Sequence, residues 1–341
     1  MVKLSAVFPR RVGYGLAYCF GAAYGFFMLR NFKFVLFFCA AAFLAGCSSP
    51  KKVVFVSGNS IHLWGDHEHV IMCDELCDMV NEASNGKVRA VHLDTQKTSD
   101  LSTLDDADAI VISTEGEKNH PFAGKTDILK KLNAKGVNIG AFHYTLMFDA
   151  PEDNAAFDEL IGGHYQKGYS YNPFYDARFE LDSSRPEHPA LRGVKSFGYY
   201  DEWHFSIYFT KNPAQKITPL LKTKVPDKIR RRRSAPQTVR DWLGKDRLET
   251  VAWVVENPNG TRGFGIMGGH VPWTLAQKDY RKLVLNTIFW LAGVDIPEAG
   301  YDASVPTFDS LVSKITKPKR GDYQYYIKDW RDFDTAARAE K

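Results

Sequence analysis

The stretch Val53-Val54-Phe55-Val56, followed by the helically spaced residues 70–83 and a second apolar run at 88–93, decides the fold of this chain. Four consecutive apolar residues are typical of a strand that is buried on both faces. The next segment concentrates its apolar residues on one helical face and therefore predicts an amphipathic helix. A strand, a helix and a second strand at this spacing indicate a right-handed crossover, which places the two strands in one parallel sheet.

The same alternation continues along the chain. Residues 109–113 (Ala-Ile-Val-Ile-Ser) and residues 137–142 predict a third and a fourth strand, with a helix expected over 128–135 between them. Each apolar run is short and bounded by polar or turn-forming residues, as expected for buried strands. These elements predict an α/β fold with a parallel sheet and helices on both of its faces.

The end of the predicted domain differs from its beginning. Residues 250–256 and 263–267 flank a turn that contains Asn259-Gly260. Because an Asn-Gly pair can adopt the positive φ angles of a tight hairpin, the two segments predict an antiparallel hairpin at one edge of the sheet. A last helix is expected over 280–292. We therefore predict one domain over residues 53–297, followed by a C-terminal tail at 298–341.

The N-terminal 46 residues predict a secretory signal peptide. They contain five basic residues and no acidic residue, and a basic region that starts at Met28 precedes the apolar segment 34–43. Leu44-Ala45-Gly46-Cys47 resembles a bacterial lipobox, in which the cysteine is lipidated and becomes the mature N-terminus. Met28 is the expected true start, and residues 47–52 are expected to form a short tether. The alternative is a transmembrane anchor, for which the apolar run is short.

This leader indicates where the protein is located. We expect a lipid-anchored protein of the bacterial cell envelope, on the outer membrane and facing the periplasm or the exterior. The whole chain has a net charge of +4 and the leader contributes +5, which leaves about −1 for the mature part. The basic balance therefore gives no indication of nucleic-acid binding. We interpret the remaining basic run, Arg230–Arg233, as a solvated loop rather than an anion site.

Two cysteines remain in the mature part, Cys73 and Cys77, and both fall on a predicted helix. A disulfide between residues four apart in one regular helix has poor geometry. Small buried cysteines are the usual alternative, so we assign these two neither a metal nor a redox role.

Titratable side chains follow several of the predicted strands. In open α/β folds, ligands bind at the carboxyl ends of the parallel strands, so these side chains are expected to converge. Neutral imidazoles together with carboxylates suit zinc or another divalent ion, and they equally suit acid–base chemistry at neutral pH. A histidine taken alone is more often structural. The relevant segments are Gly65-Asp66-His67-Glu68-His69, Ser113-Thr114-Glu115, His143-Tyr144, Asp201-Glu202-Trp203-His204 and Gly268-Gly269-His270.

Candidate roles follow from these residue types. Proton transfer is assigned to His67, His143 and Glu202. A metal ion is the only cofactor that the residues suggest, with His67, His69 and His270 as its predicted ligands and zinc as an example. Because aromatic rings can stack on the apolar faces of sugar rings, a carbohydrate is the expected ligand. Its predicted binding residues are Trp64, Glu68, Tyr144, Trp203 and His270.

Taken together, the motifs resemble the ThuA-like (trehalose-utilisation) family of the class I glutamine-amidotransferase-like superfamily. They follow the family's order across about residues 52–297. The resemblance implies a flavodoxin-like fold and a link to sugar metabolism, often of oxidised (keto) sugars. The matching pieces are 65–69, 106–111, 136–144, His188-Pro189 with Gly193-Val194, 201–203, 263–265 with 268–270, and 281–283.

One departure from the superfamily affects the expected chemistry. Glutamine amidotransferases carry a nucleophilic cysteine on a sharp turn after the corresponding strand, whereas this chain has Phe142-His143-Tyr144 there. Glutamine hydrolysis through a thioester is therefore not expected.

Three functions stay open at this level. The first is an envelope-anchored protein that acts on a carbohydrate, as a hydrolase or lyase of a keto-sugar or disaccharide, with acid–base or metal-assisted chemistry. The second is a non-catalytic sugar-binding or scaffolding lipoprotein. The third is a structural relative without a ligand, in which the histidines would lie far apart. The expected partners are a carbohydrate and, through the lipid anchor, a membrane, whereas the sequence predicts no nucleic-acid partner and no particular oligomeric state.

Overall fold

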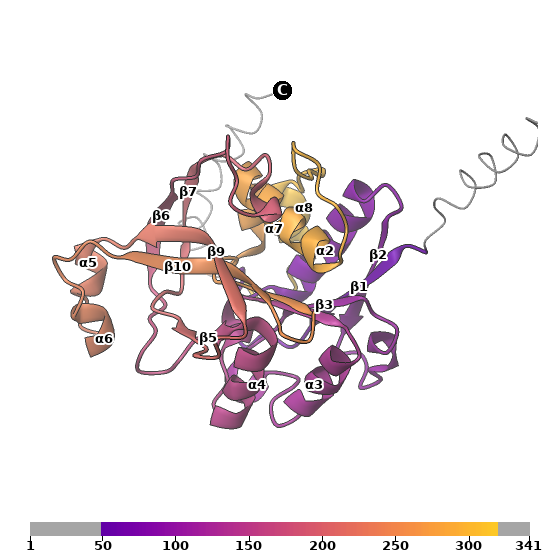
Figure 1. Cartoon of the computed structure of the whole chain (residues 1–341), viewed down its shortest axis with the longest axis horizontal. Helices are drawn as coiled ribbons and strands as arrows, with labels where there is room; N and C mark the ends of the chain where they lie inside the picture. Colours follow the sequence, from indigo (N-terminus) through magenta and orange to yellow (C-terminus); the bar gives the residue numbers. More distant parts are fainter. Residues whose placement is uncertain (1–48, 320–341) are drawn as a thin grey trace, which may run out of the picture. The chain divides into compact units, whose positions relative to one another are not determined.

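The computed structural model describes residues 49–319. The predicted signal peptide, the lipobox with Cys47, and residues 320–341 of the predicted tail lie outside the described residues. The main sheet has seven strands in the order β2-β1-β3-β4-β11-β10-β9 (Figure 1). These strands are β1 (Lys51–Ser57), β2 (Val88–Asp94), β3 (Ala109–Ser113), β4 (Asn138–Phe142), β9 (Lys216–Lys224), β10 (Leu248–Glu256) and β11 (Arg262–Ile266).

The strand directions confirm the predicted mixed sheet. Strands β2, β1, β3, β4 and β11 run parallel to one another, whereas β10 is antiparallel to β11 on one side and to β9 on the other. The hairpin β10–β11 therefore extends the sheet as expected. Strand β9, which the sequence analysis did not predict, forms the edge beyond it. This strand carries lysines at both ends and contains Pro219, features that edge strands tolerate.

Helices cover both faces of this sheet, as predicted. In Figure 1, α2 (His69–Ala83) and α7 (Lys278–Leu291) lie above the sheet, and α3 (Thr126–Ala134) and α4 (Pro151–Ile161) lie below it. Helix α4 was not predicted. Its proline in the first turn and its end at Gly162, with φ of 83°, are ordinary helix boundaries.

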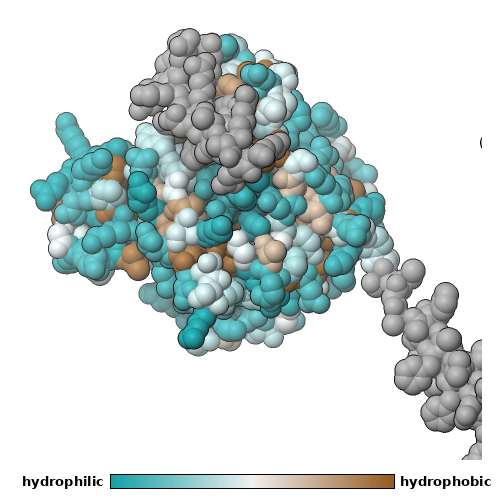
Figure 2. Space-filling model, turned by 90° about the horizontal axis from the view of Figure 1, so that it is seen from above, coloured by the Kyte–Doolittle hydropathy of each residue, from teal (hydrophilic) through white to brown (hydrophobic). Residues whose placement is uncertain are grey.

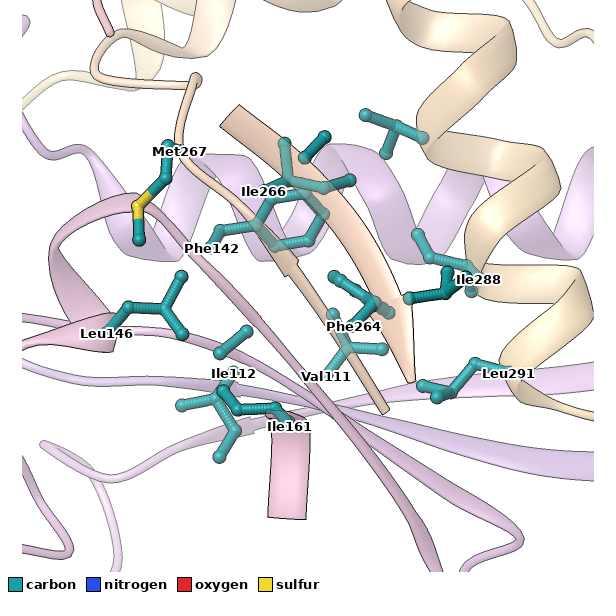
Figure 3. Packing of buried hydrophobic residues seen from close by; sticks show 14 of the residues in the cluster. Val111, Ile112, Phe142, Leu146, Ile161, Phe264, Ile266, Met267, Ile288 and Leu291 are labelled. Carbon is teal, nitrogen blue, oxygen red and sulfur yellow. The ribbon is translucent and has the colours of Figure 1, made fainter. Parts of the chain in front are cut away.

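The core between α7 and the sheet is built from large apolar side chains. Figure 3 shows Ile288 and Leu291 of α7 close to Phe264 of β11, and all three side chains are fully buried. Phe264 lies so close to β4 that a Cβ atom at Gly140 would be 2.1 Å from its ring. Glycine at position 140 therefore lets the aromatic ring pack directly on the neighbouring strand.

A second hairpin, also absent from the predictions, stands beside the main sheet. Strands β6 (Phe174–Phe179) and β7 (Phe197–Glu202) pair antiparallel, and two short strands, β5 (Gly163–His164) and β8 (Tyr208–Phe209), form a further pair. In β7 the residues alternate between buried and partly exposed. This alternation places Tyr200 and Glu202 on the same, partly exposed face.

The segment that contains the arginine run corrects one expectation. Helices α5 (Asp227–Arg230) and α6 (Gln237–Arg240) follow β9, and Arg231, Arg232 and Arg233 are exposed as expected. Arg230, however, is buried: its Nη2 atom lies 2.8 Å from Glu249 Oε1, and its guanidinium lies over the ring of Phe205. A buried arginine requires such a partner, because burying an isolated charge is costly.

The described part of the predicted tail packs on the domain. Tyr301 stacks on Phe289 of α7, with ring centroids 3.7 Å apart. Helix α8 (Phe308–Lys314) buries Phe308 and Leu311 in a small apolar cluster with Trp64 and Trp273. This cluster lies behind the loop that precedes α2, so the C-terminal residues help to hold that loop.

The molecular surface is mainly polar. The face in Figure 2 is largely hydrophilic, with small hydrophobic areas between the polar side chains. Among the described residues, the large apolar side chains that are exposed are Ile61, Leu63, Leu248 and Val305. Within residues 49–319 we find no helix of the length and hydrophobicity that a membrane span requires.

Candidate metal centre

The candidate site lies where the parallel strands end. His67 follows β1, Glu115 follows β3, His143 directly follows β4, and His270 follows β11. Strands β1, β3, β4 and β11 are neighbours in the sheet, so their carboxyl ends bring these side chains together. The fifth residue, Glu202, is the last residue of β7.

Four of these residues form a compact group, which we call the four-donor cluster: His67, His143, Glu202 and His270. One ligand atom from each lies within 4.8 Å of the others. His270 Nδ1 lies 3.0 Å from His67 Nε2, 3.2 Å from His143 Nε2 and 3.0 Å from Glu202 Oε2. Glu202 Oε2 is also 3.3 Å from His143 Nε2. The histidines therefore do not lie far apart, contrary to what was expected for a structural relative without a ligand.

These distances fit a small divalent cation. Four ligand atoms at zinc bond lengths of about 2.0–2.1 Å form a tetrahedron with edges of about 3.3 Å. Four of the six separations between the ligand atoms are 3.0–3.3 Å, which is close to that value, and the other two are within 4.8 Å. Imidazole nitrogens and one carboxylate oxygen are also the ligand types that zinc prefers.

The other ring nitrogen of each histidine faces an oxygen atom. His143 Nδ1 donates to the carbonyl oxygen of Met267 at 2.9 Å, which leaves the Nε2 lone pair directed into the cluster. His270 Nε2 lies 3.1 Å from Asp66 Oδ1, and His67 Nδ1 lies 3.7 Å from Glu115 Oε1. Such partners fix the tautomer and orientation of histidines that bind metals.

The electrostatics of the cluster favour an ionised carboxylate. Burial alone would raise the pKa of Glu202, but the three surrounding imidazoles, His143, His204 and His270, hold it well below the usual range. Burial lowers the pKa of His67 well below its ordinary value. His270 behaves differently: although burial opposes it, contacts with Asp66 and Glu202 raise its pKa to about 10. A cation between the four atoms would replace that proton, since metal and proton compete for the same lone pair.

The backbone at two ligand positions is strained. His67 has φ of 51° and His143 has φ of 50°, in the left-handed region that non-glycine residues rarely adopt. Such conformations cost about 1–3 kcal/mol each and are concentrated at functional sites. The His67 N–H donates to the carbonyl oxygen of His270 at 2.9 Å, so two ligand-bearing loops are also joined through their backbones.

A second group of titratable residues adjoins the cluster around Glu115. Its Oε1 atom accepts from His62 Nδ1 at 2.8 Å and from the Ile61 N–H at 3.1 Å. His69, a predicted metal ligand, belongs to this group rather than to the four-donor cluster. Its Nε2 lies 3.8 Å from Glu115 Oε1, and its Nδ1 lies 3.2 Å from Ser113 Oγ. Burial raises the pKa of Glu115, but the bonds from His62, His67 and His69 bring it well below the usual value.

The predicted sugar-binding residues do not all lie at the four-donor cluster. Tyr144 is half-buried, with its ring 5.2 Å from that of His67. The Glu68 carboxylate accepts a hydrogen bond from the Gly65 N–H at 2.9 Å and lies 3.2 Å from Lys317 Nζ. It therefore stabilises the loop that precedes α2. The structure corrects the tryptophan expectations. Trp203 is fully buried among Phe179, Tyr199 and Tyr280, and Trp64 is 3% exposed against Trp273, so neither ring can stack on a sugar.

Two further residues of the site were quoted in sequence motifs without receiving a role. Asp66 lies next to His67, and its carboxylate faces His270. His204 lies two positions after Glu202, with its Nε2 3.3 Å from Glu202 Oε2 and its ring 4.2 Å from that of His143. The sequence contained a signal for His204: in extended backbone, residues two apart point to the same side, so His204 could have been expected beside Glu202.

A comparison with protein families agrees with the motifs of the sequence. The family model described as ThuA, trehalose utilisation, matches residues 52–291, which is more than half of the chain and includes the whole four-donor cluster. A solved structure of a ThuA-like protein from Bacteroides uniformis is similar, with 16% sequence identity and a TM-score of 0.49, over 75% of this chain and 96% of that chain. A comparison with curated proteins gave no match. The chain therefore belongs to the ThuA family, whose description relates it to carbohydrate utilisation.

Proposed function

We propose that this chain is a metal-dependent enzyme that acts on a carbohydrate, as a hydrolase or lyase of a keto-sugar or disaccharide. The observation that carries the proposal is the convergence of three imidazole nitrogens and one carboxylate oxygen, with every pair within 4.8 Å and four of the six pairs at 3.0–3.3 Å. Two oxygen atoms on the far sides of the rings, the Met267 carbonyl behind His143 and the Asp66 carboxylate behind His270, support it because they orient the lone pairs toward the cluster. The family's description supplies the substrate class.

Zinc is the cofactor that we propose, held by His67, His143, Glu202 and His270. A bound zinc ion acts as a Lewis acid on a carbonyl or hydroxyl oxygen and lowers the pKa of water. The protein's own contribution is to fix the four ligands. Met267 and Asp66 hold the rings of His143 and His270, and Glu115 faces the ring of His67.

Two residues beside the cluster are suited to hydrogen bonding with a substrate. Burial lowers the pKa of His204 to about 4, so its imidazole is neutral at pH 7 and offers one donor and one acceptor nitrogen. Tyr144 has a pKa raised by burial and by the nearby carboxylates of Glu117 and Glu115, so its hydroxyl stays protonated and can donate. We assign Tyr144 as a hydrogen-bond donor to a sugar oxygen.

One observation favours a second candidate, a non-catalytic sugar-binding lipoprotein. Four protein ligands fill a tetrahedral zinc site completely, which is typical of structural sites, whereas catalytic zinc usually keeps one open position. In the enzymatic proposal, His67, His143, Glu202 and His270 would hold a zinc ion that supplies Lewis acidity to a substrate oxygen beyond these four ligands.

Turnover assays would separate the two candidates. The zinc-loaded protein is expected to convert at least one member of a panel of keto-glycosides and disaccharides, and both the metal-free protein and the His143→Ala variant are expected to be inactive. His92, on β2 and paired with Asp74, offers a matched control, so His92→Ala is expected to keep activity. Sugar binding without turnover in every zinc-loaded sample would contradict the enzymatic proposal and support the binding protein.

We also propose that the mature protein is anchored in the cell envelope through a lipid on Cys47. The proposal is supported by the order of the basic region, the apolar segment and Leu44-Ala45-Gly46-Cys47. The wild-type chain is expected in the membrane fraction of a bacterial host, and Cys47→Ser is expected to lose that association. Equal membrane association of the two proteins would contradict lipidation at this cysteine.

A further inference from the structure

An open cavity of about 550 Å³ lies beside the β6–β7 hairpin, and one of the residues that line it, Phe174, contacts the ring of His270 in the four-donor cluster. Its volume lies within the range of about 300–1,000 Å³ that small-molecule sites occupy. In Figure 1 this region lies at the left, where β6 and β7 stand near α5 and α6. Two hydrogen bonds join the segment before β6 to the segment around α6: Tyr171 to Ser234 (2.8 Å) and Thr238 to the carbonyl oxygen of Tyr169 (2.7 Å).

The β6–β7 hairpin places residues that line the cavity beside the cluster. In the β6–β7 register Phe174 stands directly opposite Glu202, and Tyr200 precedes Glu202 by two residues on the same face. Opposite residues of an antiparallel pair point to one side of the sheet, as do residues two apart in one strand. Phe174, Tyr200 and the ligand Glu202 therefore share one surface.

Aromatic rings form a platform on this surface. The rings of Phe174 and Tyr200 stack, with centroids 5.7 Å apart and planes inclined by 25°. The ring of Phe174 also meets that of His270 edge to face at 4.9 Å. Phe174 and Tyr200 are both partly exposed, and both line the cavity. An apolar flat ligand face can therefore lie next to the cluster.

Polar groups surround the platform. Asn172 donates to Glu202 Oε1 at 3.2 Å and accepts from the Tyr165 hydroxyl at 3.2 Å. An amide has two N–H groups and two acceptor lone pairs, so one of each remains for a ligand hydroxyl. The guanidinium of Arg232, which is exposed, donates to the carbonyl oxygen of Phe174 at 3.4 Å and lines the same cavity. Flat apolar faces ringed by hydroxyl groups are the chemistry of a pyranose ring.

We propose that this cavity is a second sugar subsite, which holds the ring that neighbours the reacting ring of a disaccharide. The inference rests on the proposed function, because it takes the four-donor cluster as the place where the first ring reacts. It assigns the platform role to Tyr200 and Phe174 and a hydroxyl-binding role to Asn172. Because these contacts are available only to a second ring, the protein binds disaccharides more tightly than single-ring sugars.

Binding measurements on the zinc-loaded full chain test the subsite. We would titrate trehalose, maltose and cellobiose, and methyl α- and β-glucoside as single-ring probes. Wild type is expected to bind at least one disaccharide about fivefold more tightly than either single-ring probe, because one aromatic contact is worth about 1 kcal/mol. Tyr200→Ala is expected to lose that gain but to keep its affinity for the single-ring probes and for zinc.

Two variants serve as controls. Tyr200→Phe keeps the ring and is expected to retain the preference for disaccharides. Tyr208→Ala removes another partly exposed tyrosine, from β8, that does not line the cavity, and it is expected to behave as wild type. Equal affinity of wild type for one-ring and two-ring probes, or an unchanged preference in Tyr200→Ala, would overturn the subsite and leave the proposed function standing. Failure of every sugar to bind the zinc-loaded wild type would overturn both.

Discussion

Replacement of His143 by alanine is expected to abolish stoichiometric zinc binding while the chain stays folded. The residue supplies one of the four donors, and its lone pair is directed by the Met267 carbonyl. Loss of partners in the outer shell typically costs 10–100-fold in metal affinity, so loss of a ligand is expected to cost more than about 100-fold. Competition with a chelator of known affinity measures the change, and circular dichroism checks the fold.

Graded variants make this test specific. Asp66→Asn keeps the size of the residue but removes the charge that faces His270, and it is expected to lower zinc affinity by about 10–100-fold. His92→Ala removes a histidine outside the cluster and is expected to bind zinc as wild type does. Wild-type zinc affinity in His143→Ala would show that the four-donor cluster is not the metal site.

Glu249→Ala is expected to cause the largest loss of stability among the variants considered. The Glu249 carboxylate is 2% exposed and neutralises Arg230, which is itself 1% exposed. Removal of one partner from a buried ion pair leaves an uncompensated charge and typically costs about 3–5 kcal/mol. Because Arg230 begins the turn that carries Arg232 and Ser234, the same variant should weaken disaccharide binding. Urea unfolding monitored by tryptophan fluorescence gives the free energy of unfolding.

The same strand provides a matched control. Glu256 ends β10 and pairs with Lys216 at 2.8 Å, but both side chains are exposed. An exposed ion pair contributes at most about 1 kcal/mol, so Glu256→Ala is expected to change the free energy of unfolding little. Similar losses in the two variants would contradict the role assigned to the buried pair.

The main sheet could be predicted because its strands are buried on both faces. Runs such as Val53-Val54-Phe55-Val56 and Ala109–Ser113 contain little but apolar residues, and turn-forming residues bound them. The β6–β7 hairpin gave no such signal, since β6 places Asp176 and Arg178 on its exposed face. A half-exposed strand without an obvious turn is hard to separate from a loop.

The histidines of the four-donor cluster could be predicted to converge to the extent that they follow strands of the main sheet. His67, His143 and His270 occupy such positions, and all three belong to the four-donor cluster. The sequence did not separate His69 from them, because the direction of a side chain at a helix start depends on the local turn. His69 opens α2 and points toward Ser113 and Glu115. The hydrogen bond from His143 to the Met267 carbonyl could not be predicted from the sequence, because every residue carries a backbone carbonyl.

The tryptophans were misjudged for a related reason. Trp203 stands between Glu202 and His204, and the polar neighbours suggested an accessible ring. In a half-buried strand, however, successive side chains point to opposite faces. Because Glu202 faces the cluster, Trp203 faces the core, where its ring packs against Tyr199 and Tyr280. The aromatic platform is instead formed by Tyr200 and Phe174, which share the face of Glu202.

The central claim is that one divalent ion binds between His67, His143, Glu202 and His270. X-ray absorption at the zinc edge of the zinc-loaded protein tests it most directly, because the spectrum reports the type, number and distance of the ligands. The account predicts one zinc per chain with three imidazole nitrogens and one carboxylate oxygen at about 2.0–2.1 Å. A zinc-free protein after loading, or a spectrum with fewer than three imidazoles, would contradict the account.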